Sequence, residues 1–221
     1  MCGWNNWYAP QGKDLGNAWR IGPDDTNWDG VLANIDINAN LSDYAGPSKG
    51  WNDPCLLLAE DENGVQRITE LQTRFQFSMW AVMASPLLIS GNIRNMSKAN
   101  IETYTNRHVI AINQDSLGKQ GVRVLGSNLT SKNTTNVWMK PLSDGFAAIA
   151  FLNVGPNATD ITCDDACLSQ VLPEQSKEKM VVCATDVWTN TRETVALSYR
   201  LVAYQVPPNG GITLFRLGNC V

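Results

Sequence analysis

The first half of the chain alternates short apolar runs with stretches of helical periodicity. Between Thr69 and Pro86, apolar residues recur every three or four positions, which is the spacing of one helix face: Leu71, Phe75, Met79 and Val82. Thr69 and Gln72 form the pattern of a capping box at the start of this stretch. Because proline cannot continue a helix, the pattern predicts a helix that begins near Thr69 and ends before Pro86.

Other segments of the first half complete the alternation. Residues 87–90 are apolar and short, as expected of a parallel strand buried on both faces. Residues 28–36 favour a helix, Ser97 offers the cap of a further helix, and residues 108–113 form a second apolar stretch. Strands that alternate with helices predict a parallel α/β fold, in which functional residues lie in the loops after the strands.

After Gly118 the pattern becomes that of a β domain. Short β-rich segments at residues 136–140, 146–151, 186–188 and 211–217 are separated by Gly, Pro, Asn and Asp. This spacing predicts a small antiparallel β-sandwich. Residues 1–118 are therefore assigned to an α/β domain, and residues 119–221 to an antiparallel β-sandwich domain.

Composition and charge narrow the classes of function. Of the 221 residues, 43% are hydrophobic and eight are tryptophan, which excludes wholesale disorder. A formal charge of −4 argues against nucleic acid or an anionic membrane as partner. The longest apolar run, residues 80–89, is too short to span a bilayer. With a single histidine, His108, which we interpret as a surface or packing residue, hydrolytic chemistry has to depend on carboxylates.

The cysteines and glycosylation sequons bear on the compartment. Cys163 and Cys167 are close enough to close a small disulfide loop, and Cys183 and Cys220 could pair with each other. A zinc site is the alternative for the first pair, but no second close pair of ligands completes it. Asn-X-Ser/Thr sequons begin at Asn40, Asn95, Asn128, Asn133 and Asn157. Together these features favour an oxidising, secretory compartment, although the chain opens without a signal peptide, so we expect the native N-terminus to differ.

Two segments combine residues that suit carbohydrate chemistry. Arg20 and Asp24 lie four residues apart in a loop with Gly and Pro, where Arg could hold a sugar hydroxyl or carboxylate and Asp could exchange a proton. The alternative is that Asp24 or Asp25 only caps the helix that begins at Trp28.

The second segment is Gly50-Trp-Asn-Asp-Pro-Cys-Leu56. Its Trp can stack on a pyranose, while Asn52 and Asp53 can bind sugar hydroxyls. The alternative is a type I turn with Asp before Pro. A third segment, Cys2-Gly3-Trp4, says little by itself.

Taken together, these segments resemble glycoside hydrolase family 27, the α-galactosidases and α-N-acetylgalactosaminidases. Cys2-Gly3-Trp4 is similar to the end of barrel strand five, Trp19 to Trp28 to strand six and its catalytic loop, and Gly50-Trp-Asn-Asp-Pro to strand seven. Ala84-Ser-Pro-Leu-Leu-Ile-Ser is similar to strand eight, and Val109 to Gly121 to the exit into the β domain. The resemblance implies that residues 1–118 are the C-terminal half, strands five to eight, of a (β/α)8 TIM barrel. A complete barrel needs about 250 residues.

The resemblance also assigns roles to individual residues. The family's acid/base aspartate lies four residues after the Trp-Arg arginine, which here is Asp24, with Asp25 as the alternative because the loop is one residue shorter. Arg20 matches the arginine that helps to hold the sugar. Trp4, Asp53 and Cys55 fall at substrate-binding positions, with Asp53 supporting the pocket.

Departures from the family pattern concern specificity and the nucleophile. Cys55 stands where the family has a second aspartate, so one acceptor for a sugar hydroxyl is lost. Gly3 is a small residue, as in the α-N-acetylgalactosaminidases, and leaves room for a 2-acetamido group. The family nucleophile, an aspartate at the end of strand four in a Lys-x-Asp-x-Cys setting, has no match in this chain. Retaining glycosidases need two carboxyl groups, so the chain alone is expected to hold half of an active site.

The resulting expectation is the C-terminal portion of a secreted or lysosomal retaining α-galactosidase. Such an enzyme takes terminal α-linked galactosides as substrate and needs no cofactor or metal, and the sequence leaves a homodimer open. Alternatives are α-N-acetylgalactosaminidase or another α-glycosidase and, from a different class, a truncated non-catalytic carbohydrate-binding protein.

Overall fold

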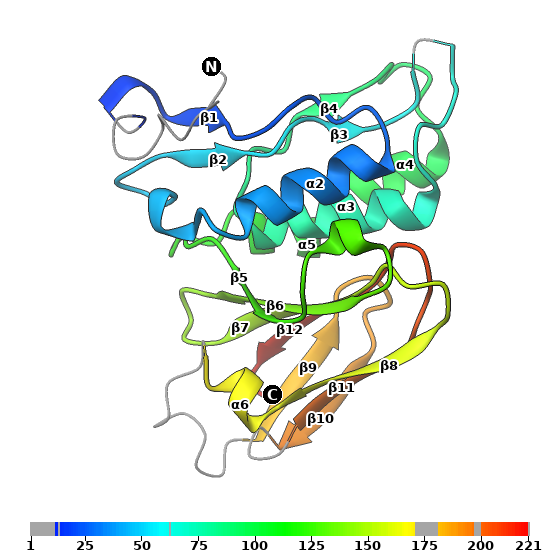
Figure 1. Cartoon of the computed structure of the whole chain (residues 1–221). Helices are drawn as coiled ribbons and strands as arrows, with labels where there is room; N and C mark the ends of the chain where they lie inside the picture. Colours follow the sequence, from blue (N-terminus) through cyan, green and yellow to red (C-terminus); the bar gives the residue numbers. More distant parts are fainter. Residues whose placement is uncertain (1–11, 13, 62, 171–180, 197–199, 221) are drawn as a thin grey trace.

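A computed structural model describes residues 12, 14–61, 63–170, 181–196 and 200–220. Four short strands lie along the upper side of Figure 1, four helices lie below them, and a β-sandwich forms the lower part. In the upper part, parallel pairs join β1 (Ala18–Arg20) to β2 (Trp51–Asp53) and β3 (Leu57–Leu58) to β4 (Ile89–Ser90). The helices are α2 (Trp28–Asn38), α3 (Glu70–Val82), α4 (Lys98–Tyr104) and α5 (Arg107–Asn113), with a 3-10 turn η2 (Ser42–Tyr44). The predicted barrel strands six, seven and eight coincide with β1, β2 and β4, and the predicted strand five at Cys2-Gly3-Trp4 lies outside the described residues.

The helices begin and end largely where the sequence predicts. In α3 the capping box is complete, because Thr69 Oγ1 accepts from the Gln72 amide at 3.3 Å and Gln72 Oε1 accepts from the Thr69 amide at 3.0 Å. Ser97 caps α4 as predicted. The cap of α2 is Asn27, whose side chain accepts from the amide of Gly30. The alternative that Asp24 or Asp25 caps this helix is therefore wrong.

The predicted strand at residues 87–90 is correct in place but wrong in burial. Only residues 89–90 are extended as a strand, and Leu88 and Ile89 are 52% and 38% exposed. Within the described residues, β4 pairs with β3 alone, so no strand covers its other edge.

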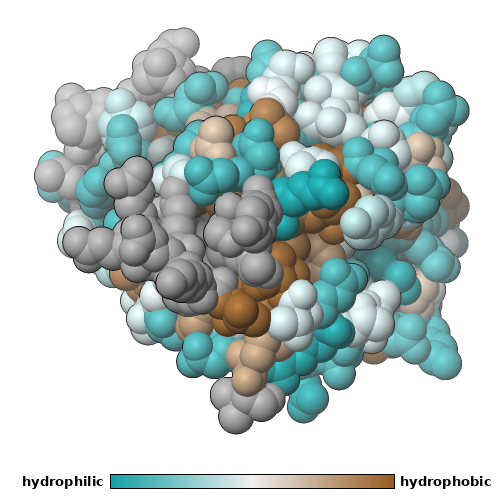
Figure 2. Space-filling view, turned by 90° about the horizontal axis from the view of Figure 1, so that it is seen from below, coloured by the Kyte–Doolittle hydropathy of each residue, from teal (hydrophilic) through white to brown (hydrophobic). Residues whose placement is uncertain are grey.

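The second part is the antiparallel sandwich that the sequence predicts. Its larger sheet has the order β10-β9-β12-β7-β6-β5, and β11 pairs with β8 in the smaller one. The bounds are β5 (Val122–Leu125), β6 (Thr135–Pro141), β7 (Ala147–Asn153), β8 (Thr159–Asp164), β9 (Val181–Asp186), β10 (Arg192–Ala196), β11 (Arg200–Val206) and β12 (Gly211–Gly218), with helical turns η3 (Leu129–Ser131) and α6 (Asp165–Leu168). Seen from below in Figure 2, apolar residues gather near the middle of this end, with hydrophilic residues around them.

The predicted segment at residues 186–188 is a strand only at its first residue. The carboxylate of Asp186 accepts from the amide of Trp188 at 2.8 Å, which turns the chain directly after β9. The segments at residues 136–140, 146–151 and 211–217 lie in β6, β7 and β12, except for Phe146, which directly precedes β7.

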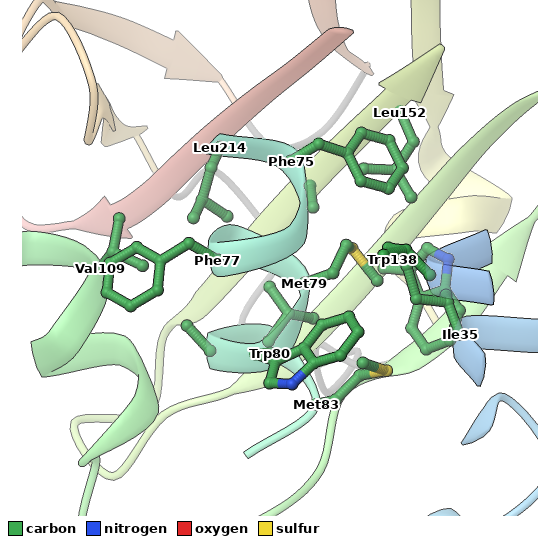
Figure 3. Close-up of a cluster of buried hydrophobic side chains, with 14 of the residues drawn as sticks. Ile35, Phe75, Phe77, Met79, Trp80, Met83, Val109, Trp138, Leu152 and Leu214 are labelled. Atoms are coloured by element: carbon green, nitrogen blue, oxygen red, sulfur yellow. The ribbon is translucent and has the colours of Figure 1, made fainter. Parts of the chain in front are cut away.

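One hydrophobic core joins the two parts. Phe75 and Met79 on α3 face Leu152 on β7 and Trp138 on β6 across the interface, and Leu214 on β12 lies beside the same helix (Figure 3). All five side chains are buried. Because α3 contacts β6, β7 and β12 of the sandwich as well as β3, the sandwich is packed directly onto a helix that supports a barrel strand.

A buried lysine crosses the same interface. Lys140 on β6 is fully buried, and its Nζ donates to the carbonyl of Ala81 at 3.0 Å and to that of Asn113 at 3.5 Å. These carbonyls lie in the last turns of α3 and α5, where the helix dipole is negative. Lys140 therefore caps two helices of one part from a strand of the other.

Burial of Lys140 predicts a pH-dependent stability. Burial lowers the pKa of Lys140 to about 8 from 10.5, and the nearby Asp115 opposes this shift only in part. Between pH 8 and pH 10.5 the side chain of Lys140 is protonated in the unfolded chain but largely neutral in the folded protein. The free energy of unfolding therefore rises with pH over this range. We expect the free energy of unfolding of the wild-type protein, measured relative to that of Lys140→Met, to rise by roughly 2 kcal/mol between pH 7 and pH 10. Urea unfolding of both proteins measures this; a pH-independent difference would contradict it.

Candidate functional site

Two candidate residues end neighbouring parallel strands. Arg20 is the last residue of β1, Asp53 is the last residue of β2, and the two are register partners. Asp24 follows in the loop between β1 and α2. In barrels of this kind the carboxyl ends of the strands form the face on which active sites are built.

Arg20 links the two carboxylates. Its Nη1 lies 2.5 Å from Asp24 Oδ1, and its Nε lies 3.6 Å from Asp53 Oδ2. Burial disfavours the charge of Arg20, but the hydrogen bond to Asp24 and the surrounding acidic groups outweigh it and raise the pKa of the guanidinium. The side chains of Arg20 and Asp53 are each 17% exposed, whereas that of Asp24 is 82% exposed. Asp24 therefore holds an exposed carboxyl against a largely buried arginine.

Asn52 has a different role from the one its motif predicts. Its side chain is 1% exposed, accepts from Trp19 Nε1 at 3.0 Å, and donates to Leu41 O and Gln120 Oε1. With its amide fully used inside the protein, Asn52 holds β1 and β2 in place and is not available to a sugar hydroxyl.

The turn after β2 is shaped by Asp53 and Cys55. Asp53 Oδ1 accepts from the amide of Cys55 at 3.1 Å, and Trp80 Nε1 donates to the Cys55 carbonyl at 2.8 Å. Cys55 has a φ of 128°, a conformation that side chains rarely adopt. Its thiol is free and buried. Cys55 thus lies below the site as part of a constrained turn.

Asp25 is buried directly beneath the exposed Asp24. It is 4% exposed, its amide donates to Cys55 Sγ at 3.4 Å, and its Oδ2 accepts from Gln76 Nε2 at 3.1 Å. Burial raises the pKa of Asp25 to about 6, an effect that the interaction with Cys55 and the charge of Arg20 only partly offset. Burial also raises the pKa of the Cys55 thiol to about 11, so the thiol is neutral near pH 7.

The raised pKa of Asp25 has a consequence for stability. In the folded protein the carboxyl ionises near pH 6, but in the unfolded chain near 3.8. As the pH rises through this window the folded state is penalised, and the full penalty is present above pH 6. Relative to wild type, we expect Asp25→Asn to gain roughly 2 kcal/mol in the free energy of unfolding between pH 4 and pH 7. Thermal unfolding at both pH values tests this, with the exposed Asp29→Asn, which should show no such gain, as control.

The remaining predicted site residues are the cysteines of the β domain and Trp4. Cys163 and Cys167 form the predicted disulfide, with a Cα–Cα distance of 5.2 Å, and Cys183 is bonded to Cys220. The zinc alternative is therefore wrong, and the described part of the chain holds no cluster of metal-ligating side chains. Trp4, with Cys2 and Gly3, lies outside the described residues.

Gln76 is the residue of the site that the sequence did not single out. It is fully buried on α3, donates to Leu56 O as well as to Asp25, and accepts from the amide of Leu58 at 2.9 Å. The signal was present, because a glutamine between Phe75 and Phe77 in an apolar helix has to find buried partners.

Comparison with known families covers most of the chain. Residues 6–115 match the family described as alpha galactosidase A, and residues 132–216 match the alpha galactosidase C-terminal beta sandwich domain. No described helix is long and apolar enough to cross a membrane.

Individual relatives agree with these matches. The chain is 36% identical over 198 residues to an alpha-galactosidase of Cyamopsis tetragonoloba, covering 88% of this chain and 44% of the relative. It is 35% identical over 147 residues to an alpha-N-acetylgalactosaminidase of Gallus gallus, covering 63% of this chain and 34% of the relative. Alpha-galactosidase I from Mortierella vinacea has a similar fold, with a TM-score of 0.82 at 21% identity over 97% of this chain and 56% of that structure. The chain spans about half the length of the curated relatives that it matches.

Proposed function

The chain belongs to the α-galactosidase family, glycoside hydrolase family 27, and we propose that the protein cleaves terminal α-linked galactose from oligosaccharides or glycoconjugates with retention. The observation that carries the proposal is Arg20 at the end of β1, paired with both Asp24 and Asp53 at the barrel face where active sites lie. This arrangement offers one exposed carboxyl and one fixed cation to a sugar.

In the proposed mechanism Asp24 is the acid/base residue. It protonates the leaving-group oxygen as the glycosidic bond breaks and then removes a proton from the attacking water. The exposure of its carboxyl supports Asp24 over Asp25, which is 4% exposed. Arg20 holds Asp24 and a sugar hydroxyl, and Asp53 keeps Arg20 in place.

A retaining mechanism also needs a nucleophilic carboxylate on the other face of the sugar. The resemblance assigns it to an aspartate in a Lys-x-Asp-x-Cys segment, which is absent from these 221 residues. We therefore propose that this chain supplies the acid/base half of the site, in a secreted or lysosomal enzyme. Cys55, whose thiol is neutral near pH 7 and buried below the site, stands at the position of a family carboxylate.

A panel of nitrophenyl α-glycosides tests the proposal. The protein at the full length of its gene should hydrolyse the α-galactoside fastest. Faster turnover of the α-N-acetylgalactosaminide would favour the second candidate, which the similarity to the alpha-N-acetylgalactosaminidase of Gallus gallus supports. Binding of galactosides without turnover of any glycoside would favour a non-catalytic carbohydrate-binding protein.

A further inference from the structure

The buried carboxyl of Asp25 has no part in the chemistry proposed above. Within the described residues its Oδ1 has no hydrogen-bond partner, and its Oδ2 has only Gln76. A buried carboxyl with an unsatisfied oxygen destabilises a folded protein. Strongly perturbed carboxyls of this kind gather at functional sites, and this one lies next to Asp24 in the chain.

Asp25 joins the loop of Asp24 to the turn of Asp53. Its amide donates to Cys55 Sγ, and the amide of Cys55 donates in turn to Asp53 Oδ1. Its carboxyl is held by Gln76, which also binds the chain on the far side of the turn, at Leu56 and Leu58. The loop and the turn are therefore connected through the backbone and the side chain of a single residue.

The packing of α2 leaves Asp25 little room to move. A methyl group placed on Gly30, in the first turn of α2, would lie 3.0 Å from Asp25 Cα and 3.1 Å from its Cβ. Arg20 contacts Asp24 in the loop and Asp53 in the turn, and Asp25 connects that loop to that turn. A displaced Asp25 would therefore change one or both of the contacts of Arg20.

Given the proposed function, we propose that Asp25 is a positioning residue that fixes Asp24 and Asp53 on either side of Arg20. Its buried carboxyl is held by Gln76, beside the Cys55 thiol. Asp25 does not touch the substrate. It acts through the loop that carries the acid and through the turn that carries the partner of Arg20.

The ionised carboxyl positions the loop best, because it accepts a charge-assisted hydrogen bond from Gln76 and attracts Arg20. The titratable groups around it are Arg20 on β1, Asp24 in the same loop, Cys55 in the turn and Tyr104 on α4. Burial sets the pKa of Asp25 to about 6, so the contribution of Asp25 to turnover is expected to fall as the pH drops below 6.

Two substitutions in the full-length protein separate positioning from mere packing. Asp25→Leu keeps the branching at Cγ but is larger, and Asp25→Ala is smaller; both remove the acceptor and the charge. Asp25→Asn keeps the size of the side chain and the acceptor for Gln76. We expect Asp25→Leu to lower kcat/KM at least tenfold for α-galactosides with poor leaving groups, and Asp25→Asn to recover most of this activity above pH 6. The fall in activity below pH 6 should be smaller in Asp25→Asn than in wild type. Asp29→Leu, on the exposed first turn of α2, is the control and should match wild type.

A second readout does not depend on turnover. The Arg20 Nε–H resonance in ¹⁵N NMR spectra should shift in Asp25→Leu but stay in place in Asp25→Asn and Asp29→Leu. If Asp25→Leu does not fold, Asp25→Ala replaces it. Wild-type turnover and an unshifted Arg20 resonance in Asp25→Leu would overturn the positioning role. Absence of any glycoside turnover by the wild-type protein would overturn the proposed function instead, and the Arg20 resonance would still decide the role of Asp25.

Discussion

Asp24→Asn is expected to lower kcat of the full-length protein by a factor of about 10² to 10⁴ for α-galactosides with poor leaving groups, the range that general acid catalysis supplies. Asn keeps the shape of the side chain and its contact with Arg20 but carries no proton to give to the leaving oxygen. An activated leaving group such as dinitrophenolate departs without a proton, so its galactoside should lose far less in the first step of the reaction.

The measurement is a series of aryl α-galactosides with graded leaving-group pKa values, hydrolysed by wild type and by Asp24→Asn. The control is Asp29→Asn, in which an exposed aspartate of α2, paired with Lys132, loses the same charge. An equal loss in kcat/KM, which reports the first step of the reaction, for every leaving group would show that Asp24 binds the sugar instead of donating a proton.

Much of the fold could be predicted because its signals are local. The capping box of α3, the Ser97 cap of α4 and the short cysteine loop each involve residues within four positions of one another, and each is confirmed. The β-rich composition after Gly118 likewise predicts the change of domain, and the strands of the sandwich begin there with β5.

The details of the site could not be predicted because they depend on contacts distant in sequence. Asp24 and Asp25 are neighbours in an irregular loop, where no periodicity separates an exposed residue from a buried one. Their difference is set by Gln76, about fifty positions away, and by Cys55. The side chain of Asn52 is similarly occupied by Trp19 and Gln120, which are 33 and 68 positions away in the sequence.

The contact between the two parts leads to the largest expected effect on stability, at Asp36. This α2 residue, whose side chain is 9% exposed, pairs with Arg123 of β5 and accepts from the amides of Leu129 and Thr130 at 2.9 and 3.0 Å. It also accepts from the hydroxyl of Thr130 at 3.0 Å. Asp36 thus binds one helix of the partial barrel to the first strand and to the η3 turn of the sandwich.

Asp36→Ala should lower the free energy of unfolding by roughly 3–5 kcal/mol, because it leaves the charge of Arg123 and two backbone amides without their acceptor. The matched control is Asp144→Ala, which breaks an ion pair with Arg216, whose side chains are 38% and 44% exposed, and one hydrogen bond from the amide of Phe146. These two interactions together should contribute only about 1–2 kcal/mol. Urea unfolding of the three proteins measures both values. Similar losses in the two variants would show that Asp36 stabilises the contact between the partial barrel and the sandwich no more than a surface pair stabilises the contact between a turn and a strand.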